Sequence, residues 1–278
     1  MTNEGRLSAY LLPAFSNRAL GSFKRDELQT FLDEKAGSGL SFSTVAHLRW
    51  DLRQIFRLAV EEGYISRNPA ELLFVPRDAA RPDRPVMNRE EVQKCFAALE
   101  HRERLIVKLA VLVGLRPGEI FGLQWKHLNG SYVEIRQRVY RGELDSPKSS
   151  HSVRKAAIPA GVFAEIEAWR AVSPITSADA WVFPSETLKT PLSRDNLWRR
   201  EIAPKLRCVG LEWVDFHVMR RTHATLMNEI HDDPKMIADQ LGHTLDVSQN
   251  VYTQASVDRR KKAVDALEAA LAVPEPVP

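Results

Sequence analysis

A stretch rich in proline and charge, residues 75–85, limits most strongly what this chain can fold into. It reads Val-Pro-Arg-Asp-Ala-Ala-Arg-Pro-Asp-Arg-Pro, with three prolines and five charged residues. Proline lacks a backbone N–H and fixes φ, so such a stretch opposes both helix and sheet. We therefore predict an exposed linker over residues 77–85, with one domain on each side of it. The 278 residues of the chain are enough for two modest domains.

Helical periodicity dominates the segment before the linker. Asp26 is placed to cap a helix over residues 28–32, and Ser43 or Thr44 is placed to cap a second helix. The apolar residues of the second helix recur at helical spacing: Val45, Leu48, Leu52, Ile55, Phe56, Ala59 and Val60. Residues 1–76 are therefore predicted to form an all-helical domain.

The segment after the linker also opens with helix signals. Asn88 and Glu91 have the spacing of a capping box, and the apolar run 105–113 predicts a buried helix. Pro117 suits the first turn of a further helix, which places Arg116 directly before a helix start.

A small sheet is expected in the middle of this second segment. Residues 131–140 and 153–158 have the composition and partial alternation of strands, and residues 142–151 are predicted to form a long hairpin loop between them. Helices resume near Val162. We therefore predict a mainly α protein, whose second domain over residues 86–262 is mostly helical with a small antiparallel sheet.

Composition excludes several other classes of protein. No apolar run reaches transmembrane length, and the first residues do not resemble a signal peptide. Cys95 and Cys208 are the only cysteines, which gives neither a disulfide framework nor metal-ligand spacing and fits a reducing cytoplasm. The net charge of +3 permits nucleic-acid binding but does not establish it, so the distribution of charge must carry that argument.

Six chemically competent side chains follow one another at characteristic intervals through the second segment. The histidine and arginine of His-Val-Met-Arg are three positions apart, and a tyrosine follows the histidine of Leu-Gly-His nine positions later. Taken singly, each has an ordinary structural alternative, such as packing or a solvated surface. In chain order the six are Arg116, Lys148, His217, Arg220, His243 and Tyr252.

This order closely resembles the catalytic signature of the tyrosine recombinases, the phage integrase family, and the resemblance covers about residues 5–262. It implies a helical, SAM-like core-binding domain and an α-rich catalytic domain that clamp opposite faces of a DNA duplex. Residues 40–70 resemble the core-binding motif. Because this motif begins almost at the start of the chain, we expect no separate arm-binding domain.

The resemblance implies covalent chemistry on a DNA phosphodiester. Tyr252 is then the nucleophile and forms a 3′-phosphotyrosyl bond, while Arg116 and Arg220 hold the scissile phosphate. Each guanidinium can present a planar fork of donors to phosphate oxygens. Glu119 matches the family acidic residue that orients the first arginine. The covalent bond conserves the phosphodiester energy, so neither a metal nor ATP nor another cofactor is expected.

The remaining three signature residues are assigned proton-transfer and binding roles by the resemblance. Lys148 protonates the leaving 5′ hydroxyl, His217 acts in acid–base chemistry, and His243 donates a hydrogen bond to the phosphate. The loop that holds Lys148 also leads into Arg154 and Lys155, so a solvated basic loop is the alternative for Lys148. This sequence continues from Arg220 with Arg-Thr-His, where the family usually has His-Thr, and its span from Arg116 to Lys148 is longer than in compact members.

Two groups of polar and basic residues are candidates for DNA contact. On the helix predicted to start at residue 43 or 44, four-residue spacing places three arginines along one side, with hydroxyl and imidazole groups near its start: Ser43, Thr44, His47, Arg49, Arg53 and Arg57. The second group, Arg194, Arg199 and Arg200, is similar to a family helix that enters DNA from the catalytic side. A solvated basic face is the alternative for both groups.

Partners follow from the resemblance. Residues 257–271 predict a short amphipathic helix, and the tail 263–278 is expected to dock on a neighbouring protomer or to pack on its own domain. We expect a specific double-stranded DNA site, a homo-tetramer on that DNA, a monomer or weak oligomer without it, and a directionality or DNA-bending factor. A cytoplasmic, nucleoid-associated location is expected, with no membrane.

The predicted activity is site-specific strand exchange by an integrase-type recombinase of a bacterium or phage. A DNA-binding protein that kept the fold and lost catalysis is the alternative from another class. A topoisomerase of type IB is the alternative with similar chemistry and no synapsis.

Overall fold

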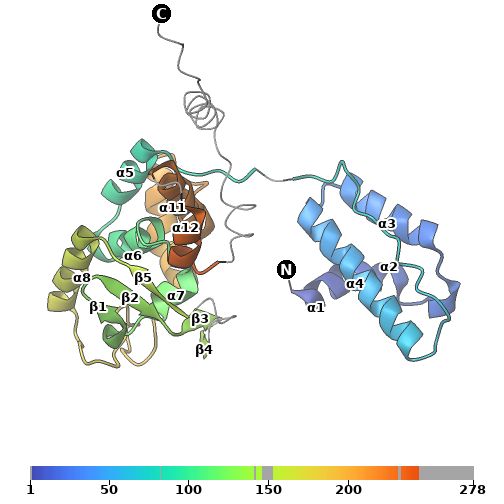
Figure 1. Cartoon of the computed structure of the whole chain (residues 1–278), viewed down its shortest axis with the longest axis horizontal. Helices are drawn as coiled ribbons and strands as arrows, with labels where there is room; N and C mark the ends of the chain where they lie inside the picture. Colours follow the sequence, from blue (N-terminus) through green and yellow to red (C-terminus); the bar gives the residue numbers. More distant parts are fainter. Residues whose placement is uncertain (1, 82, 141, 146–152, 231–232, 244–278) are drawn as a thin grey trace, which may run out of the picture. The chain divides into compact units, whose positions relative to one another are not determined.

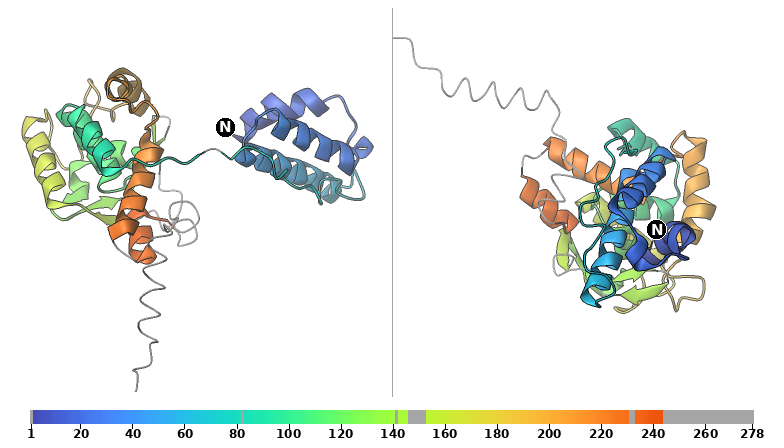
Figure 2. Two further views of the ribbon diagram at one scale, coloured as in Figure 1. Left: turned by 90° about the horizontal axis from the view of Figure 1, so that it is seen from above. Right: turned by 90° about the vertical axis from the view of Figure 1, so that its right-hand side faces the viewer.

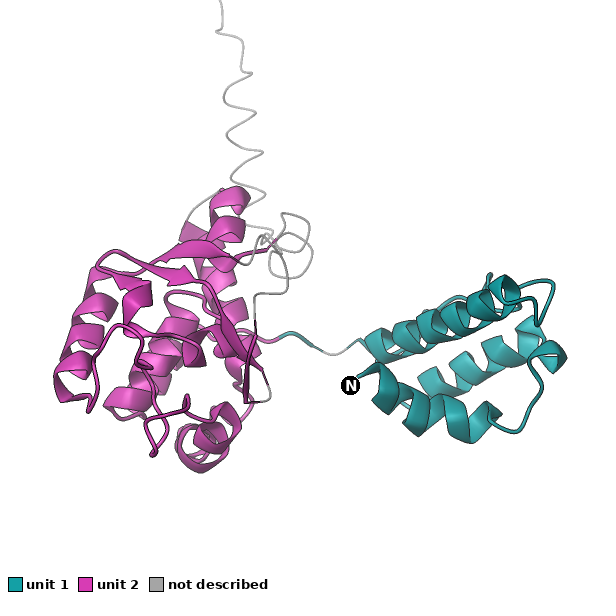
Figure 3. Cartoon of the chain, turned by 90° about the horizontal axis from the view of Figure 1, so that it is seen from below, with its two compact units in different colours: residues 1–84 teal, residues 85–278 magenta. Residues whose placement is uncertain are grey.

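The computed structural model describes residues 2–243 apart from residues 82, 141, 146–152 and 231–232. The chain divides into two compact units, residues 1–84 and residues 85–278 (Figures 1 and 3). Helices dominate both units, and a small antiparallel sheet lies in the second, which confirms the predicted fold class. Within the described ranges, none of the helices combines the length and apolar character needed to cross a bilayer.

The first unit packs short N-terminal helices against two longer helices that lie side by side (Figures 1 and 2). Its elements are α1 (Asn3–Arg6), the π-helical turn η1 (Leu7–Leu11), α2 (Leu12–Phe15), the 3-10 turn η2 (Leu20–Ser22), α3 (Arg25–Gly37) and α4 (Phe42–Glu61). The helical spacing of their apolar residues brings one face of each long helix into the core, where Leu28, Leu32, Val45 and Leu48 are fully buried.

The helices of the first unit start earlier than the predicted caps. Ser41 caps α4, because its hydroxyl accepts a hydrogen bond from the Thr44 amide at 3.3 Å. Glu27 accepts from the Lys24 amide at 3.1 Å, so α3 begins at Arg25 and Asp26 lies inside the first turn. A serine at the N-cap position accepts a hydrogen bond from the unpaired amide three residues later. A residue that already lies inside the helix cannot cap that amide.

A buried ion pair ties the first turn of the chain to the middle of α4. Arg6 Nε and Nη2 donate to the two carboxylate oxygens of Asp51 at 2.7 and 2.9 Å, and both side chains are 5% exposed. The two parallel bonds match the guanidinium fork to the carboxylate, which is the geometry that makes a buried pair tolerable.

The predicted linker 77–85 is not exposed along its whole length. Ala79 is buried in the first unit, the Ala80 carbonyl accepts from the Phe42 amide at 2.7 Å, and the Arg81 guanidinium lies 4.5 Å from the centre of the Phe42 ring. The amides at the start of α4 have no partner within the helix, and Ala80 supplies one acceptor. Of the described residues in this stretch, Ala79 departs from the predicted exposure, whereas Ala80 and Arg81 are exposed as predicted.

In the second unit the helix His101–Val111 is packed among several other helices, and the small sheets lie in the same unit (Figure 1). Its helices are α5 (Arg89–Ala97), α6 (His101–Val111), α7 (Pro117–Phe121), η3 (Trp125–His127), α8 (Ala160–Val172), α9 (Arg194–Leu197), η5 (Trp198–Ile202), α10 (Ala203–Cys208), α11 (Phe216–Ile230) and α12 (Pro234–Leu241). The predicted capping box is confirmed, because Asn88 and Glu91 each accept from the other's amide, at 2.9 and 2.8 Å.

The strands form two small antiparallel sheets. One has the order β1 (Leu128–Asn129), β2 (Tyr132–Ile135) and β5 (Arg154–Ala157), and the other is the hairpin of β3 (Arg138–Tyr140) and β4 (Glu143–Asp145). The predicted strand 131–140 is thus two strands, which part at Gln137, where the side-chain amide donates to the Gly122 carbonyl at 2.8 Å. The predicted loop 142–151 begins with β4.

Candidate active site

A tight turn between α6 and α7 brings three helices together at the candidate site. Gly114 has φ +77°, and a Cβ atom there would lie 2.7 Å from atoms of both His223 and Leu241. Only glycine fits this close approach without strain. Two residues later Arg116 is the N-cap residue of α7, with Pro117 in its first turn, as predicted.

Glu119 holds Arg116 by two bonds. One carboxylate oxygen accepts from the Arg116 amide at 2.9 Å, and the other accepts from Arg116 Nη1 at 2.8 Å. The Glu119 side chain is 5% exposed, whereas that of Arg116 is 36% exposed. The carboxylate therefore aims a guanidinium that still reaches solvent.

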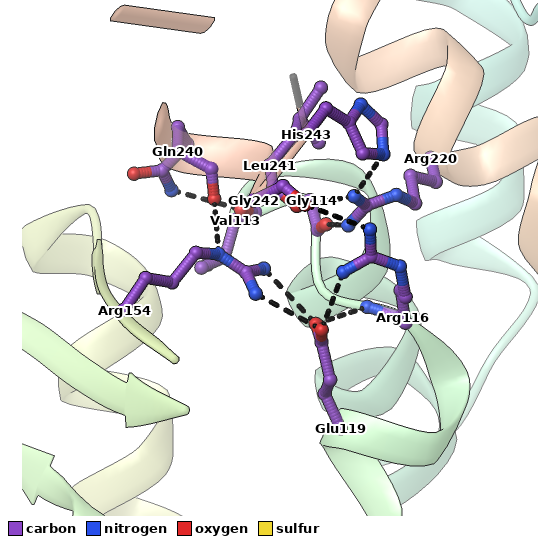
Figure 4. Close-up of polar contacts among 10 residues, drawn as sticks. All are labelled: Val113, Gly114, Arg116, Glu119, Arg154, Arg220, Gln240, Leu241, Gly242 and His243. Atoms are coloured by element: carbon purple, nitrogen blue, oxygen red, sulfur yellow. Dashed lines mark hydrogen bonds and ion pairs between the residues drawn. The ribbon is translucent and has the colours of Figure 1, made fainter. Parts of the chain in front are cut away.

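A second arginine binds the same carboxylate from the sheet side. Arg154, on β5, donates from Nη1 and Nη2 to the two oxygens of Glu119, both at 3.0 Å (Figure 4). Burial by itself raises the pKa of Glu119, but the hydrogen bonds from Arg154 and the charges of Arg154, Arg116 and Arg220 outweigh it and lower that pKa to about 2. Glu119 is therefore an anion across the physiological pH range.

Arg220 lies at the centre of the cluster, on α11 and 3% exposed. It donates to the carbonyls of Gly114 and Leu241, and its Nη2 lies 2.6 Å from His243 Nε2. Because a guanidinium has only donors, His243 Nε2 must accept, which assigns the ring proton to Nδ1. Burial and the charges of Arg220, Arg116 and Arg154 lower the pKa of His243 to about 3, so its imidazole is neutral near pH 7.

The position of His243 depends on the end of α12. Gly242 has φ +64° and closes the helix in a left-handed conformation, so the chain turns directly toward Arg220. The carbonyls of three successive residues at this helix end then each accept from a different arginine (Figure 4): Gln240 from Arg154 Nε at 2.9 Å, Leu241 from Arg220, and Gly242 from Arg116 Nη2 at 3.0 Å.

The structure therefore brings together four of the residues singled out in the sequence: Arg116, Glu119, Arg220 and His243. His217 lies on α11 one turn before Arg220 and is exposed. Lys148 and Tyr252 lie outside the described residues.

Arg154 was missed as a site residue, because its sequence context reads as a basic loop. Strand alternation carried the missing signal. Residues 154, 156 and 158 share one face, and Ala156 and Ile158 show that this face is apolar and buried. An arginine on such a face needs an internal carboxylate, and Glu119 supplies it.

The predicted DNA-contacting residues of the first unit lie along α4. Ser43, His47 and Arg57 are exposed, whereas Thr44, Arg49 and Arg53 are half-buried. The outer arginines are paired with carboxylates: Arg53 with Glu71 at 2.7 Å and Arg57 with Glu61 at 3.0 Å.

The second predicted group, Arg194, Arg199 and Arg200, lies exposed on α9 and η5. Arg194 pairs with Asp195 at 2.7 Å, and Arg199 donates to the Asn196 side chain at 3.3 Å. Across the described part of the chain, no group of three or more histidine, cysteine, aspartate or glutamate side chains is arranged to hold a metal ion.

Comparison with known proteins gives consistent matches. The sequence profile of the phage integrase family matches residues 85–259. A XerC-like tyrosine recombinase of Caldanaerobacter subterraneus is 25% identical, over 88% of this chain and 70% of its own length. The ICEBs1 integrase of Bacillus subtilis is 27% identical, over 87% of this chain and 70% of its own length.

Solved structures share the fold. The Tn1549 transposon integrase in complex with a circular intermediate DNA superimposes with a TM-score of 0.77 at 18% identity, covering 96% of this chain and 94% of that one. A lambda integrase fragment bound as a dimer to a COC′ core site superimposes with a TM-score of 0.65 at 18% identity, covering 92% and 93%. With its family profile spanning more than half of its residues, this chain belongs to the phage integrase family of tyrosine recombinases.

Proposed function

We propose that this protein is a site-specific, integrase-type DNA recombinase that cuts and rejoins strands through a 3′-phosphotyrosine bond, without metal or ATP. The observation that carries the proposal is the cluster of Arg116, Arg220 and His243 around one turn. Arg116 and Arg154 hydrogen-bond the carboxylate of Glu119, and Arg220 acts on it through its charge, so these four side chains together carry two more positive than negative charges. A phosphodiester is an anion that such a surplus attracts.

Phosphate binding falls to Arg116 and Arg220. A guanidinium has five N–H donors, and Glu119 and Gly242 engage two nitrogens of the Arg116 side chain. Since that side chain is 36% exposed, it can also donate to a phosphate oxygen. These donors stabilise the charge that builds on the non-bridging oxygens during attack, and losing one such donor typically costs roughly 10²–10³ in rate.

Bond exchange falls to the signature residues outside the cluster or at its edge. The phenolic oxygen of Tyr252 attacks phosphorus, and the bond to the 5′ oxygen breaks as Lys148 gives that oxygen a proton. His217 acts in the acid–base chemistry, and His243 hydrogen-bonds the phosphate. In the second step a 5′ hydroxyl of a partner strand attacks the phosphotyrosine and releases Tyr252. No step consumes energy, because one phosphoester replaces another.

The partner is a specific double-stranded DNA site. The basic residues of α4, α9 and η5 supply phosphate contacts, and affinity should therefore fall steeply with added salt. The complexes of the Tn1549 and lambda integrases with DNA support this partner. We further propose a homo-tetramer on the DNA, an accessory directionality or DNA-bending factor, and action in the cytoplasm on the nucleoid.

Covalent trapping tests the function. Nicked duplexes tiled from DNA flanking the gene are offered to the protein, beside the Tyr252→Phe variant. We expect one tile to give a gel-stable adduct that is absent in the variant, while both proteins bind it equally. An adduct that persists in Tyr252→Phe contradicts the assigned nucleophile. Specific binding without adduct indicates the inactive alternative, and relaxation of supercoiled DNA without a preferred site indicates the topoisomerase alternative.

A further inference from the structure

The last turn of α12 is held by arginines from three different elements. The carbonyls of Gln240, Leu241 and Gly242 accept from Arg154, Arg220 and Arg116 in that order (Figure 4). The C-terminal end of a helix carries partial negative charge on its unpaired carbonyls, so the three cations complement it. This turn carries His243 and leads into the segment of the proposed nucleophile.

Arg154 joins the carboxylate of Glu119 to the end of this helix through three nitrogens of one buried side chain. Its side chain is 7% exposed, both terminal nitrogens bind Glu119, and Nε binds Gln240. A Cβ on Gly242 would lie 2.9 Å from two atoms of the Arg154 side chain, so the glycine backbone rests directly on this arginine. Arg154 thus joins β5, the Glu119 carboxylate and the end of α12.

Gln240 strengthens the same junction. Its side-chain amide donates to the carbonyls of Val113 and Ala157 at 2.9 and 3.1 Å, and its side-chain carbonyl accepts from the Ala157 amide at 2.9 Å. Since Ala157 and Arg154 lie on the same strand, β5 grips α12 at its side and at its end. Loss of the Arg154 contacts therefore affects the C-terminal end of α12 more than the packing of α12 against β5.

We propose that Arg154 is a positioning residue for strand cleavage: it fixes the end of α12 and the carboxylate of Glu119 in one arrangement, so that His243 and Arg116 meet the same phosphate. The inference rests on the proposed function. Arg154 does not touch the reacting atoms in this role. It acts through Glu119 on one side and through the turn 240–242 on the other.

Charge gives this role a distinctive signature. Among the described residues, the charged or titratable groups that face Glu119 are Arg116 of its own helix, Arg154 of β5, Arg220 of α11 and the neutral His243. Beside the same helix, Arg138 of β3 pairs with Asp145 at 2.5 Å. Burial raises the pKa of Glu119, and three guanidiniums lower it. Without Arg154 only two guanidiniums remain, so the pKa of Glu119 rises. Protonation of Glu119 as the pH falls then weakens its hydrogen bonds with Arg116.

Single-turnover cleavage of the trapping duplex tests the proposal in the full chain. Arg154→Met removes charge and fork, and we expect cleavage to fall about 10²-fold with unchanged DNA affinity, since small misplacement of a reacting group costs about this much. The loss should widen as the pH is lowered from about 9 to about 6. Arg154→Lys keeps the charge without the fork, so its smaller loss should not change with pH. Arg170→Met, an exposed arginine on α8, is the matched control.

Two measurements without DNA separate this proposal from the proposed function. Hydrogen exchange of the amides in residues 238–243 should accelerate in Arg154→Met and stay unchanged in Arg170→Met. The carboxyl resonance of Glu119, assigned with Glu119→Gln, should titrate at higher pH in Arg154→Met. If wild-type protein forms no adduct on any duplex, the proposed function fails while these two results still decide the positioning role.

Clear outcomes overturn the inference. Wild-type cleavage in Arg154→Met, or a loss that is equal at every pH and comes with unchanged exchange at 238–243, excludes a positioning role. Should Arg154→Met fail to fold, as judged by its thermal transition and DNA binding, Arg154→Lys decides through its own cleavage rate and exchange: wild-type values of both contradict the proposal.

Discussion

Both units bury ionised side chains, and they do so in opposite ways. In the first unit Arg6 and Asp51 form a closed pair of one cation and one anion, each 5% exposed. In the second unit Glu119 is hydrogen-bonded by Arg116 and Arg154 and feels the charge of Arg220, so among these four side chains cations outnumber the anion. Burying charge costs free energy unless it is compensated, and one carboxylate balances one guanidinium in the first arrangement but not three in the second.

The difference teaches how a structural ion pair is distinguished from a site. A balanced pair needs nothing further, and its contribution is to hold two segments together. An unbalanced cluster carries unfavourable repulsion in the free protein, which an incoming anion relieves. Clusters with an excess of one charge concentrate at functional sites. The hydrogen-bond geometry of such a cluster resembles that of a balanced ion pair, so the net charge distinguishes them.

Breaking the balanced pair should have the largest effect on stability. Arg6→Ala leaves Asp51 buried without its partner, and loss of one member of a buried pair costs about 3–5 kcal/mol. We expect hydrogen exchange of the α3 and α4 amides in the intact chain to report this loss of stability, while exchange of the α6 amides stays unchanged. The double variant Arg6→Met/Asp51→Leu should recover most of it. A loss below about 1 kcal/mol in Arg6→Ala would contradict the comparison.

Removing a cation from the unbalanced cluster should instead affect the rate. Arg116→Met relieves repulsion as it breaks the bonds to Glu119 and Gly242, so we expect the free energy of unfolding to change by about 1 kcal/mol or less. Single-turnover cleavage should fall roughly 10²–10³-fold. Global denaturation and adduct formation, measured on the same preparation, check this. A destabilisation as large as that of Arg6→Ala would erase the distinction between the two regions.

The pH dependence of stability should sharpen the comparison further. Burial, in spite of the hydrogen bond to the Val111 carbonyl, lowers the pKa of His223 to about 4. Between the ordinary value of about 6.5 and this value the unfolded chain binds a proton that the folded protein does not, so stability falls as the pH falls. From about pH 7 to about pH 5 the contribution of His223 to the stability of the second unit should fall by roughly 2 kcal/mol, and His243, whose pKa is also lowered, adds a loss of the same sign. His223→Asn should make this profile less steep in denaturant titrations, whereas an unchanged slope would refute the assignment.

Helix caps should give the smallest effect, and the same one in both units. Ser41→Ala and Asn88→Ala each remove a side-chain acceptor from a helix start. We expect each to cost about 1 kcal/mol in its own unit. Neither should change the cleavage rate of the bound complex. Hydrogen exchange of the α4 and α5 amides measures the two losses of stability. If removing either cap changed the cleavage rate, the difference between the units would not be one of charge.

Local patterns predicted much of the fold and part of the site. The capping box at Asn88 and the helix start at Arg116 depend on residues within one turn, so the sequence contains the information that decides them. The cap at Ser41 is equally local, because its acceptor lies three residues before the Thr44 amide, and the predicted cap was placed two or three residues too late. The bond from the Phe42 amide to the Ala80 carbonyl connects residues that sequence spacing does not bring together.

Arg154 shows where prediction from residues stops. Its pairing with Glu119 spans 35 residues, and its bond to Gln240 spans 86. Strand alternation predicts that it is buried, yet only the folded arrangement selects its partner. Arg116, Arg220 and His243 could be singled out because their motifs resemble a family signature, whereas Arg154 stands in no such motif.

Gly114 constrains which residues can replace it and which side chains can accompany such a replacement at two other positions. A single methyl group there collides with the side chains of residues 223 and 241 together, and the backbone angle already disfavours any other residue. In a library that randomises position 114 alone, glycine should be the sole survivor. A change at residue 114 therefore also requires changes at residues 223 and 241, so active descendants that have lost Gly114 should differ at all three positions.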